Sequence, residues 1–82
     1  MPKIPRDVNA ATLLQGLRQY GYSMTRQTGS HIRLLSTRNQ DAHRITIPAH
    51  DPIKIGTLNA ILNDVAGYLT ISKDELVTKL FG

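Results

Sequence analysis

A tight turn between two alternating segments constrains this chain more than any other feature. The segments "YSMTRQ" (residues 22–27) and "HIRLLS" (31–36) each alternate in polarity, and "TGS" lies between them. Alternation with a period of two is typical of a β-strand, and glycine reaches the positive φ that a tight turn requires. The sequence therefore predicts an antiparallel hairpin. Such a turn has no need of the histidine that opens the second strand.

Residues 10–20 predict an amphipathic helix ahead of this hairpin. Apolar side chains recur there at helical spacing, Asn9 is the expected N-cap, and Gly21 is the expected stop. Gly16 inside the helix is unfavourable unless another element packs closely against it.

The chain after the hairpin predicts one more strand and two helices. A polar loop leads to "HRITIP" (43–48), which alternates like a third strand. "GTLNAILNDVAGYL" predicts a helix with Thr57 as N-cap and Gly67 as its end, and Ser72 begins a short last helix. This order predicts an α+β fold, a two-layer α-β-β-β-α domain with the helices on one face of a three-stranded antiparallel sheet.

The strand periodicity assigns the basic side chains to one face of this sheet. Ile32 and Leu34 share a face of the second strand, so His31 and Arg33 point to the other face. In the third strand Arg44 lies opposite the apolar residues. The basic faces of both strands can therefore coincide on the uncovered side of the sheet.

Positive charge is concentrated in the first part of the chain. The net charge is +4, and residues 1–54 hold eight Lys and Arg against three Asp, a balance of +5. A basic surface favours a polyanionic partner, because each neutralised phosphate releases counterions, and guanidinium groups fit phosphate well. On charge alone, a solvated surface that binds no anion is equally compatible.

Length and composition limit the class of protein. A chain of 82 residues buries too little surface for two cores, so one domain over residues 1–82 is expected. The absence of cysteine excludes disulfides and thiolate metal sites and suits a reducing cytoplasm. No apolar run approaches the ~20 residues that span a bilayer, and the first residues do not resemble a signal peptide. A cytoplasmic protein without membrane contact is expected.

Three histidines are the candidate chemical groups. His43 opens a strand on the apolar face and is expected to be a core-edge residue with a satisfied ring nitrogen. His50 follows Pro48 in a loop, which it is expected to organise through hydrogen bonds. His31 lies on the uncovered face, where an imidazole can transfer the protons needed when the 2′-hydroxyl of RNA cleaves its own phosphodiester. From these residues alone, a surface histidine without a chemical role remains the default interpretation.

Other chemistries lack a motif in this sequence. The histidine spacing and the missing cysteines give no zinc motif, and there is no Gly-rich phosphate loop. Ser30 and His31 are neighbours in sequence and so point to opposite faces of a strand, which places them poorly as nucleophile and base. We expect no metal and no cofactor.

Five short motifs, taken in order, resemble the HicA family, also called YcfA-like proteins. They are "LRQYGY", "RQTGSHIRL", "ITIPAH", "KIGTLNAIL" and "ISKDEL", and together they cover nearly the whole chain. The most specific elements are Gly29-Ser30-His31, Pro48 with His50, and Gly56-Thr57-Leu58.

The resemblance implies a toxin of a type II toxin–antitoxin system. Members of the family are mRNA interferases with a fold similar to double-stranded-RNA-binding domains, and their catalytic histidine matches His31. A HicB antitoxin neutralises them, which implies a protein partner and a hetero-oligomer. The polar loop at residues 37–42 and the additional His43 depart from the family pattern.

The leading hypothesis is thus an endoribonuclease that cuts mRNA without a metal, using His31 as general acid or base. The alternative is a non-catalytic module that holds structured RNA on the same basic face, since double-stranded RNA is read largely through shape and phosphates. The candidate RNA contacts are Arg26, Arg33, Arg44 and Lys54, and the supporting motif residues are Gly29, Ser30 and His50.

Overall fold

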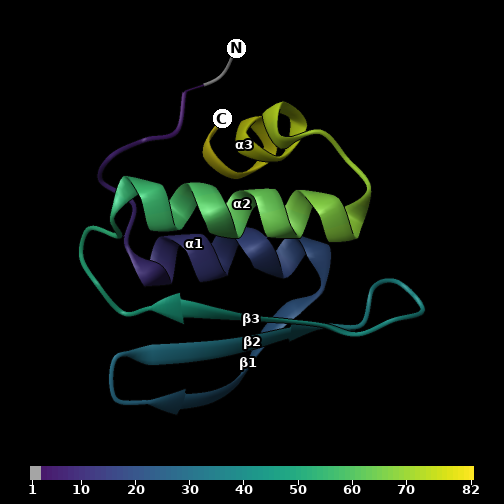
Figure 1. The fold of residues 1–82 in the computed structure, drawn as a ribbon, viewed down its shortest axis with the longest axis horizontal. Coiled ribbons are helices and arrows are strands. Elements are labelled where there is room, and N and C mark those ends of the chain that lie inside the picture. Colours follow the sequence, from purple (N-terminus) through teal and green to yellow (C-terminus); the bar gives the residue numbers. More distant parts are fainter. Residues whose placement is uncertain (1–2) are drawn as a thin grey trace.

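The computed structural model describes residues 3–82 and places three α-helices on one side of an antiparallel sheet (Figure 1). This arrangement confirms the predicted α+β order. Helix α3 packs on α1 and α2, on the side away from the sheet (Figure 1). The elements are α1 (Ala10–Leu17), a 3₁₀ turn (Arg18–Tyr20), β1 (Tyr22–Thr28), β2 (His31–Ser36), β3 (His43–Pro48), α2 (Ile55–Leu69) and α3 (Lys73–Phe81).

The sheet has the strand order β1-β2-β3, and the predicted hairpin joins its first two strands. The hairpin loop consists of Gly29 and Ser30, and only Gly29 has a positive φ, of 57°. Glycine in the first loop position with positive φ is the pattern of a type II′ turn, whose twist matches that of the flanking strands. The turn places His31 at the first position of β2.

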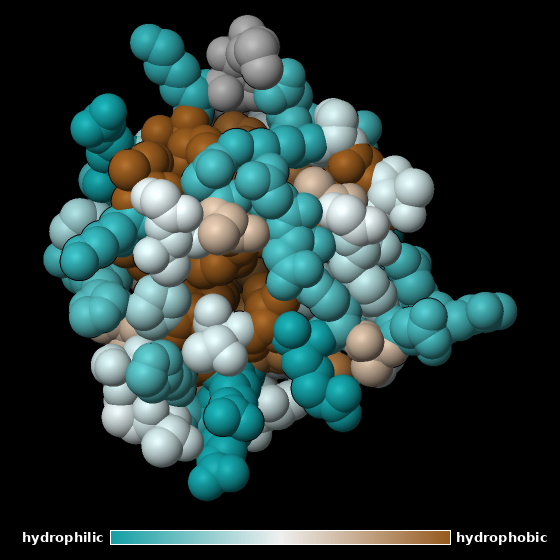
Figure 2. Space-filling view, viewed as in Figure 1, coloured by the Kyte–Doolittle hydropathy of each residue, from teal (hydrophilic) through white to brown (hydrophobic). Residues whose placement is uncertain are grey.

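One hydrophobic core lies between the sheet and the helices. Figure 2 shows brown apolar residues in this middle region, above a sheet side that is mostly teal and white. No helix within residues 3–82 is long and apolar enough to span a membrane. The most deeply buried apolar side chains include Leu13 and Leu17 of α1, Tyr22 of β1, Leu34 of β2, Ile47 of β3, Leu58, Leu62 and Val65 of α2, and Leu76 of α3.

The close contact expected at Gly16 is made by the last helix. A Cβ atom on Gly16 would lie 2.9 Å from Cδ2 of Leu80 in α3, nearer than such atoms approach in proteins. The missing side chain therefore leaves room for the Leu80 side chain of α3 against α1, at a position where glycine lowers helix stability.

The ends of α1 and the start of α3 follow the sequence prediction. The Asn9 side chain accepts a hydrogen bond from the Thr12 amide at 2.8 Å, and Gly21 ends the helical segment with φ 84°. The Ser72 hydroxyl accepts a hydrogen bond from the Glu75 amide at 3.0 Å. These bonds satisfy amides that have no partner within their own helix.

The predicted start of α2 at Thr57 is wrong. The helix begins at Ile55 with Lys54 in the N-cap position, where no side chain of residues 3–82 caps the amides. The Leu58 amide already donates to the Lys54 carbonyl at 2.9 Å, so Thr57 lies within the first turn. Ile53, fully buried and bonded through its amide to the Val8 carbonyl, fixes the chain just before the helix.

The predicted end of α2 at Gly67 is also wrong. The helix continues through Gly67 to Leu69 and ends at Thr70, which takes φ 58°. Tyr68 and Leu69 are partly buried against the core. The Tyr68 hydroxyl also donates to the Asp41 carbonyl at 2.6 Å. These tertiary contacts extend the helix past a residue that often ends one.

Gly67 therefore offers a test of the helix end. Replacing it by alanine should stabilise the protein by about 1 kcal/mol, because the residue is helical and a Cβ there would meet no atom of the described residues within 4 Å. Urea unfolding of Gly67→Ala should show a higher midpoint than the parent protein. A lower midpoint would mean that Gly67 takes a left-handed conformation and that the helix ends there.

Candidate functional site

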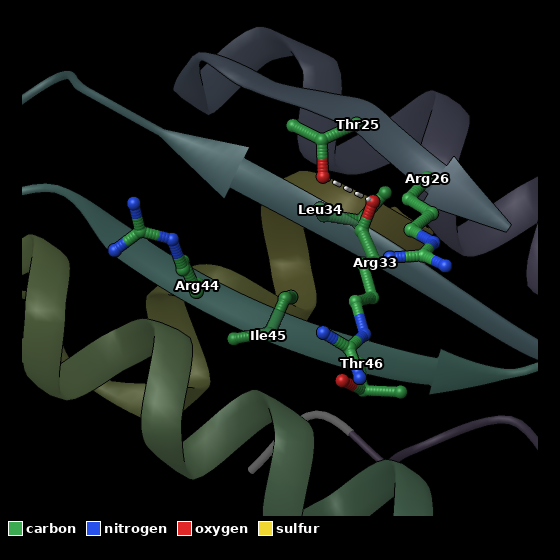
Figure 3. A pocket seen from close by; sticks show the side chains of 7 residues that line it. All are labelled: Thr25, Arg26, Arg33, Leu34, Arg44, Ile45 and Thr46. Atoms are coloured by element: carbon green, nitrogen blue, oxygen red, sulfur yellow. Dashed lines mark hydrogen bonds between the residues drawn. The ribbon is translucent and has the colours of Figure 1, made fainter.

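The sheet face away from the helices carries three exposed arginines, Arg26, Arg33 and Arg44, here called the arginine face. Cross-strand pairing sets Arg26 opposite Arg33, and Arg33 opposite Thr46. Figure 3 shows the side chains of Arg26, Arg33 and Thr46 in a row across the strands, and Arg44 lies further along β3. A hollow of about 360 Å³ lies among them. The prediction that the basic faces of the strands coincide is confirmed.

A β-bulge at Thr25 allows Arg26 to join this face. Met24 pairs with Leu34 and Arg26 pairs with Arg33, so Thr25 is an additional residue in β1. With regular alternation Arg26 would have pointed toward the helices, because successive strand residues alternate between faces. The Thr25 hydroxyl donates to the Arg33 carbonyl at 3.3 Å and ties the bulge to β2 (Figure 3).

The arginine face is electrostatically unfavourable on its own. Arg26 and Arg33 are directly opposite, and like charges in that position destabilise a sheet. Within residues 3–82 none of the three arginines forms an ion pair with a carboxylate. Packing and stability do not explain this arrangement, whereas an anionic ligand would neutralise it.

A second hollow adjoins the arginine face at the end of the sheet where β2 begins. It also measures about 360 Å³, and Thr46 lines both hollows. The β1–β2 turn and the loop from β3 to α2 both lie at this end of the sheet (Figure 1). The second hollow is here called the histidine pocket, and its lining residues are His31, Thr46, Pro48, His50, Lys54 and Thr57.

Strand pairing assembles the histidine pocket from three segments of the chain. His31 lies opposite Pro48 in the sheet, and the Ala49 amide donates to the Ser30 carbonyl at 2.6 Å just beyond this pair. The second bond holds the start of the β3–α2 loop against the hairpin turn. His50 follows at once in that loop, so its exposed ring lines the same hollow as the exposed ring of His31.

The expected role of His50 in organising its loop is not observed. Neither the His31 nor the His50 ring forms a hydrogen bond with any residue in the described range 3–82. The loop is held by its backbone instead, through the Ala49 amide and the Ile53 amide. Both imidazoles are thus free to meet a ligand.

Two hydroxyls in the pocket were not predicted as site residues. Thr46 lies opposite Arg33 in the sheet and so shares the uncovered face with the arginines. Thr57 was taken for a helix cap and lies in the first turn of α2 instead. Hydroxyls can donate hydrogen bonds to phosphate oxygens.

His43 lies at the opposite end of the sheet and packs at the edge of the core, as predicted. Its side chain is 17% exposed, its Nδ1 lies 2.6 Å from the Tyr22 hydroxyl, and its Nε2 lies 3.1 Å from Asp64 Oδ1. Burial raises the pKa of the Tyr22 phenol, and the nearby Tyr68 and Asp64 side chains raise it further. The phenol therefore stays protonated and shares a hydrogen bond with Nδ1, while Nε2 faces Asp64.

Replacing His43 by alanine should lower the stability of the protein. The change leaves the buried Tyr22 hydroxyl without its partner, which costs about 1–3 kcal/mol, and removes the stacking of His43 on Tyr68. Urea unfolding should show this loss as a lower midpoint. A midpoint equal to that of the parent protein would mean that the contacts of His43 do not support the core.

The fold and the site define a small α-β-β-β-α domain with an open basic sheet face and two free histidines at its edge. The family model for the HicA toxin of bacterial toxin–antitoxin systems matches residues 10–66. This match covers most of the chain and includes the arginine face and the histidine pocket. The chain therefore belongs to the HicA toxin family, which confirms the resemblance noted in the sequence.

The matched range ends within α2, so α3 lies outside it. Comparisons with curated proteins and with solved structures find no match. Membership of the family makes this chain the toxin of a toxin–antitoxin pair, with an antitoxin as its partner.

Proposed function

We propose that this toxin is an endoribonuclease that cleaves mRNA without a metal and uses His31 as general acid or base. The observation that carries the proposal is the position of His31 in a hollow that shares Thr46 with the hollow of the arginine face. A phosphate backbone held by the arginines and Lys54 would pass the exposed imidazole. Residues 1–82 would act as a single domain in the cytoplasm, where mRNA is translated.

The reaction requires two proton transfers. The 2′-oxygen of one nucleotide attacks the adjacent phosphorus, the bond from phosphorus to the 5′-oxygen breaks, and the products carry a 2′,3′-cyclic phosphate and a 5′-hydroxyl. A base must take the 2′-hydroxyl proton, and an acid must supply a proton to the departing 5′-oxygen. An imidazole can perform either transfer near neutral pH, and His31 performs one of them.

The side chains around His31 favour charge neutralisation by the protein itself. Among the described residues 3–82 no carboxylate lines either hollow, and carboxylates are the side chains through which proteins usually bind Mg²⁺. Guanidinium and ammonium groups are present instead, and they can stabilise the negative charge that develops on the phosphate oxygens.

The antitoxin would inhibit the toxin by covering the same surface. We propose a HicB-type partner whose acidic residues lie across the arginine face and the histidine pocket. Charge complementarity of this kind makes association fast and sensitive to salt. A complex in which the partner contacts only the helices, with the sheet face open, would contradict this mode of inhibition.

Incubation of the purified protein with mRNA, with and without a chelator, tests the proposed activity. We expect cleavage in both cases and products that end in a 2′,3′-cyclic phosphate. Intact but bound RNA would favour the non-catalytic module, and cleavage that the chelator abolishes would indicate a metal enzyme.

A further inference from the structure

We propose that His50 is a second catalytic residue, which performs the proton transfer that His31 does not. The inference rests on the proposed ribonuclease function and extends it from one histidine to a pair. One imidazole would accept the proton of the 2′-hydroxyl, and the other would donate a proton to the 5′-oxygen.

The position of the two rings in the fold is the first support. His31 and His50 come from different segments but line one hollow of about 360 Å³. The pairing of His31 with Pro48 and the bond between the Ser30 carbonyl and the Ala49 amide hold the two backbones next to each other beside the hollow. A substrate phosphate that enters the hollow would meet both imidazoles.

The freedom of both rings is the second support. His43 uses both ring nitrogens within the fold, at 2.6 Å and 3.1 Å from its partners. The rings of His31 and His50 are exposed and form no hydrogen bond within residues 3–82. Within this range His50 thus makes no hydrogen bonds of the kind that hold His43 in the fold. Each free imidazole can accept or donate a proton.

The other side chains of the pocket are poor candidates for the second transfer. They supply two hydroxyls, an ammonium group and a proline ring. Hydroxyl and ammonium groups seldom change their protonation state near neutral pH, whereas an imidazole does so readily. Lys54 is better suited to hold a phosphate oxygen, which leaves His50 as the complement of His31.

The proposed step balances in protons and bonds. The neutral ring takes the 2′-hydroxyl proton while the 2′-oxygen bonds to phosphorus. The bond to the 5′-oxygen breaks, and this oxygen receives a proton from the other, protonated ring. The two rings end with exchanged protonation states, and proton exchange with solvent restores them.

Single-turnover cleavage by the parent, His31→Ala and His50→Ala tests the pair. On ordinary RNA each variant should cleave about 10²- to 10⁴-fold more slowly than the parent. The parent rate should be bell-shaped in pH, and each variant should lose a different limb of the bell. A substrate with sulfur in place of the bridging 5′-oxygen needs no acid, so it should restore fast cleavage to one variant and not to the other.

His50→Gln separates proton transfer from packing. Glutamine retains a polar side chain of similar length but does not change its protonation state near neutral pH. This variant should therefore show the same slow rate as His50→Ala and lose the same limb of the pH–rate curve. Circular dichroism should match the parent for all three variants, and RNA affinity should fall only modestly in each. If glutamine restores the parent rate, His50 has a structural role only and the inference fails.

The other possible results of these cleavage assays also test the proposed role of His50. Cleavage by His50→Ala at the parent rate would overturn the inference and leave the proposed function intact. Recovery of both variants, or of neither, on the sulfur substrate would show that the two rings do not divide the transfers. If the parent protein leaves RNA uncut, the proposed function fails and the inference fails with it.

Discussion

The His31→Ala variant should cleave RNA about 10²- to 10⁴-fold more slowly than the parent protein, which is the usual effect of removing a general acid or base. Its stability should change by no more than about 0.5 kcal/mol, because the ring is exposed and bonds to no other residue of the described range 3–82. Single-turnover cleavage and urea unfolding measure the two effects separately. The combination of a large rate effect and a small stability effect would identify a catalytic residue.

Binding and growth provide two further readouts for this variant. RNA affinity should fall only modestly, since most of the binding energy would come from the arginines and Lys54. Expression without the antitoxin should no longer arrest growth. His43→Ala is the matched control, because it should lose stability and retain the rate. Cleavage by His31→Ala at close to the parent rate would remove His31 from the mechanism.

The strands and their faces could be predicted because the sheet buries only one face. A shift of one residue would have moved Leu34 or Ile47 into water, so the alternating pattern determines the register of β2 and β3. The same pattern placed His31, Arg33 and Arg44 on the uncovered face. This part of the site follows from periodicity alone.

The bulge in β1 could not be predicted from that pattern. β1 is an edge strand, and only Tyr22 within it is buried, so apolar burial does not fix the positions that follow. Arg26 was a candidate for its charge alone. The additional residue Thr25 and its bond to the Arg33 carbonyl give Arg26 the orientation that the role requires.

The proximity of His31 and His50 required the three-dimensional structure. The two residues are far apart in sequence, and His50 lies in a loop without periodicity. The antiparallel pairing of β2 with β3 brings Pro48 opposite His31, and the Ala49 amide extends this contact toward His50. The ends of α2 were missed for a related reason, since Ile53 and Tyr68 act there through tertiary contacts.

Replacing all three residues of the arginine face by glutamine should weaken RNA binding strongly. Each phosphate contact on a single strand adds about 0.7 to the steepness with which log affinity falls against log salt, so three contacts account for a slope of about 2. Near 0.1 M salt the same three contacts raise the affinity roughly 10²-fold. Measured in the His31→Ala background, where RNA stays intact, the triple variant should lose both. Its stability should rise by about 0.2–1 kcal/mol, because Arg26 and Arg33 no longer oppose each other.

A triple variant of equal charge change is the control for this prediction. Arg6, Arg18 and Lys79 are exposed and line neither the arginine hollow nor the histidine pocket. Their replacement by glutamine lowers the net charge equally, so a loss caused by overall charge would appear in both variants. We expect the control to retain most of the affinity and most of the salt slope. Equal losses would mean that RNA is attracted by the total charge of the protein and that the sheet face is no specific contact surface.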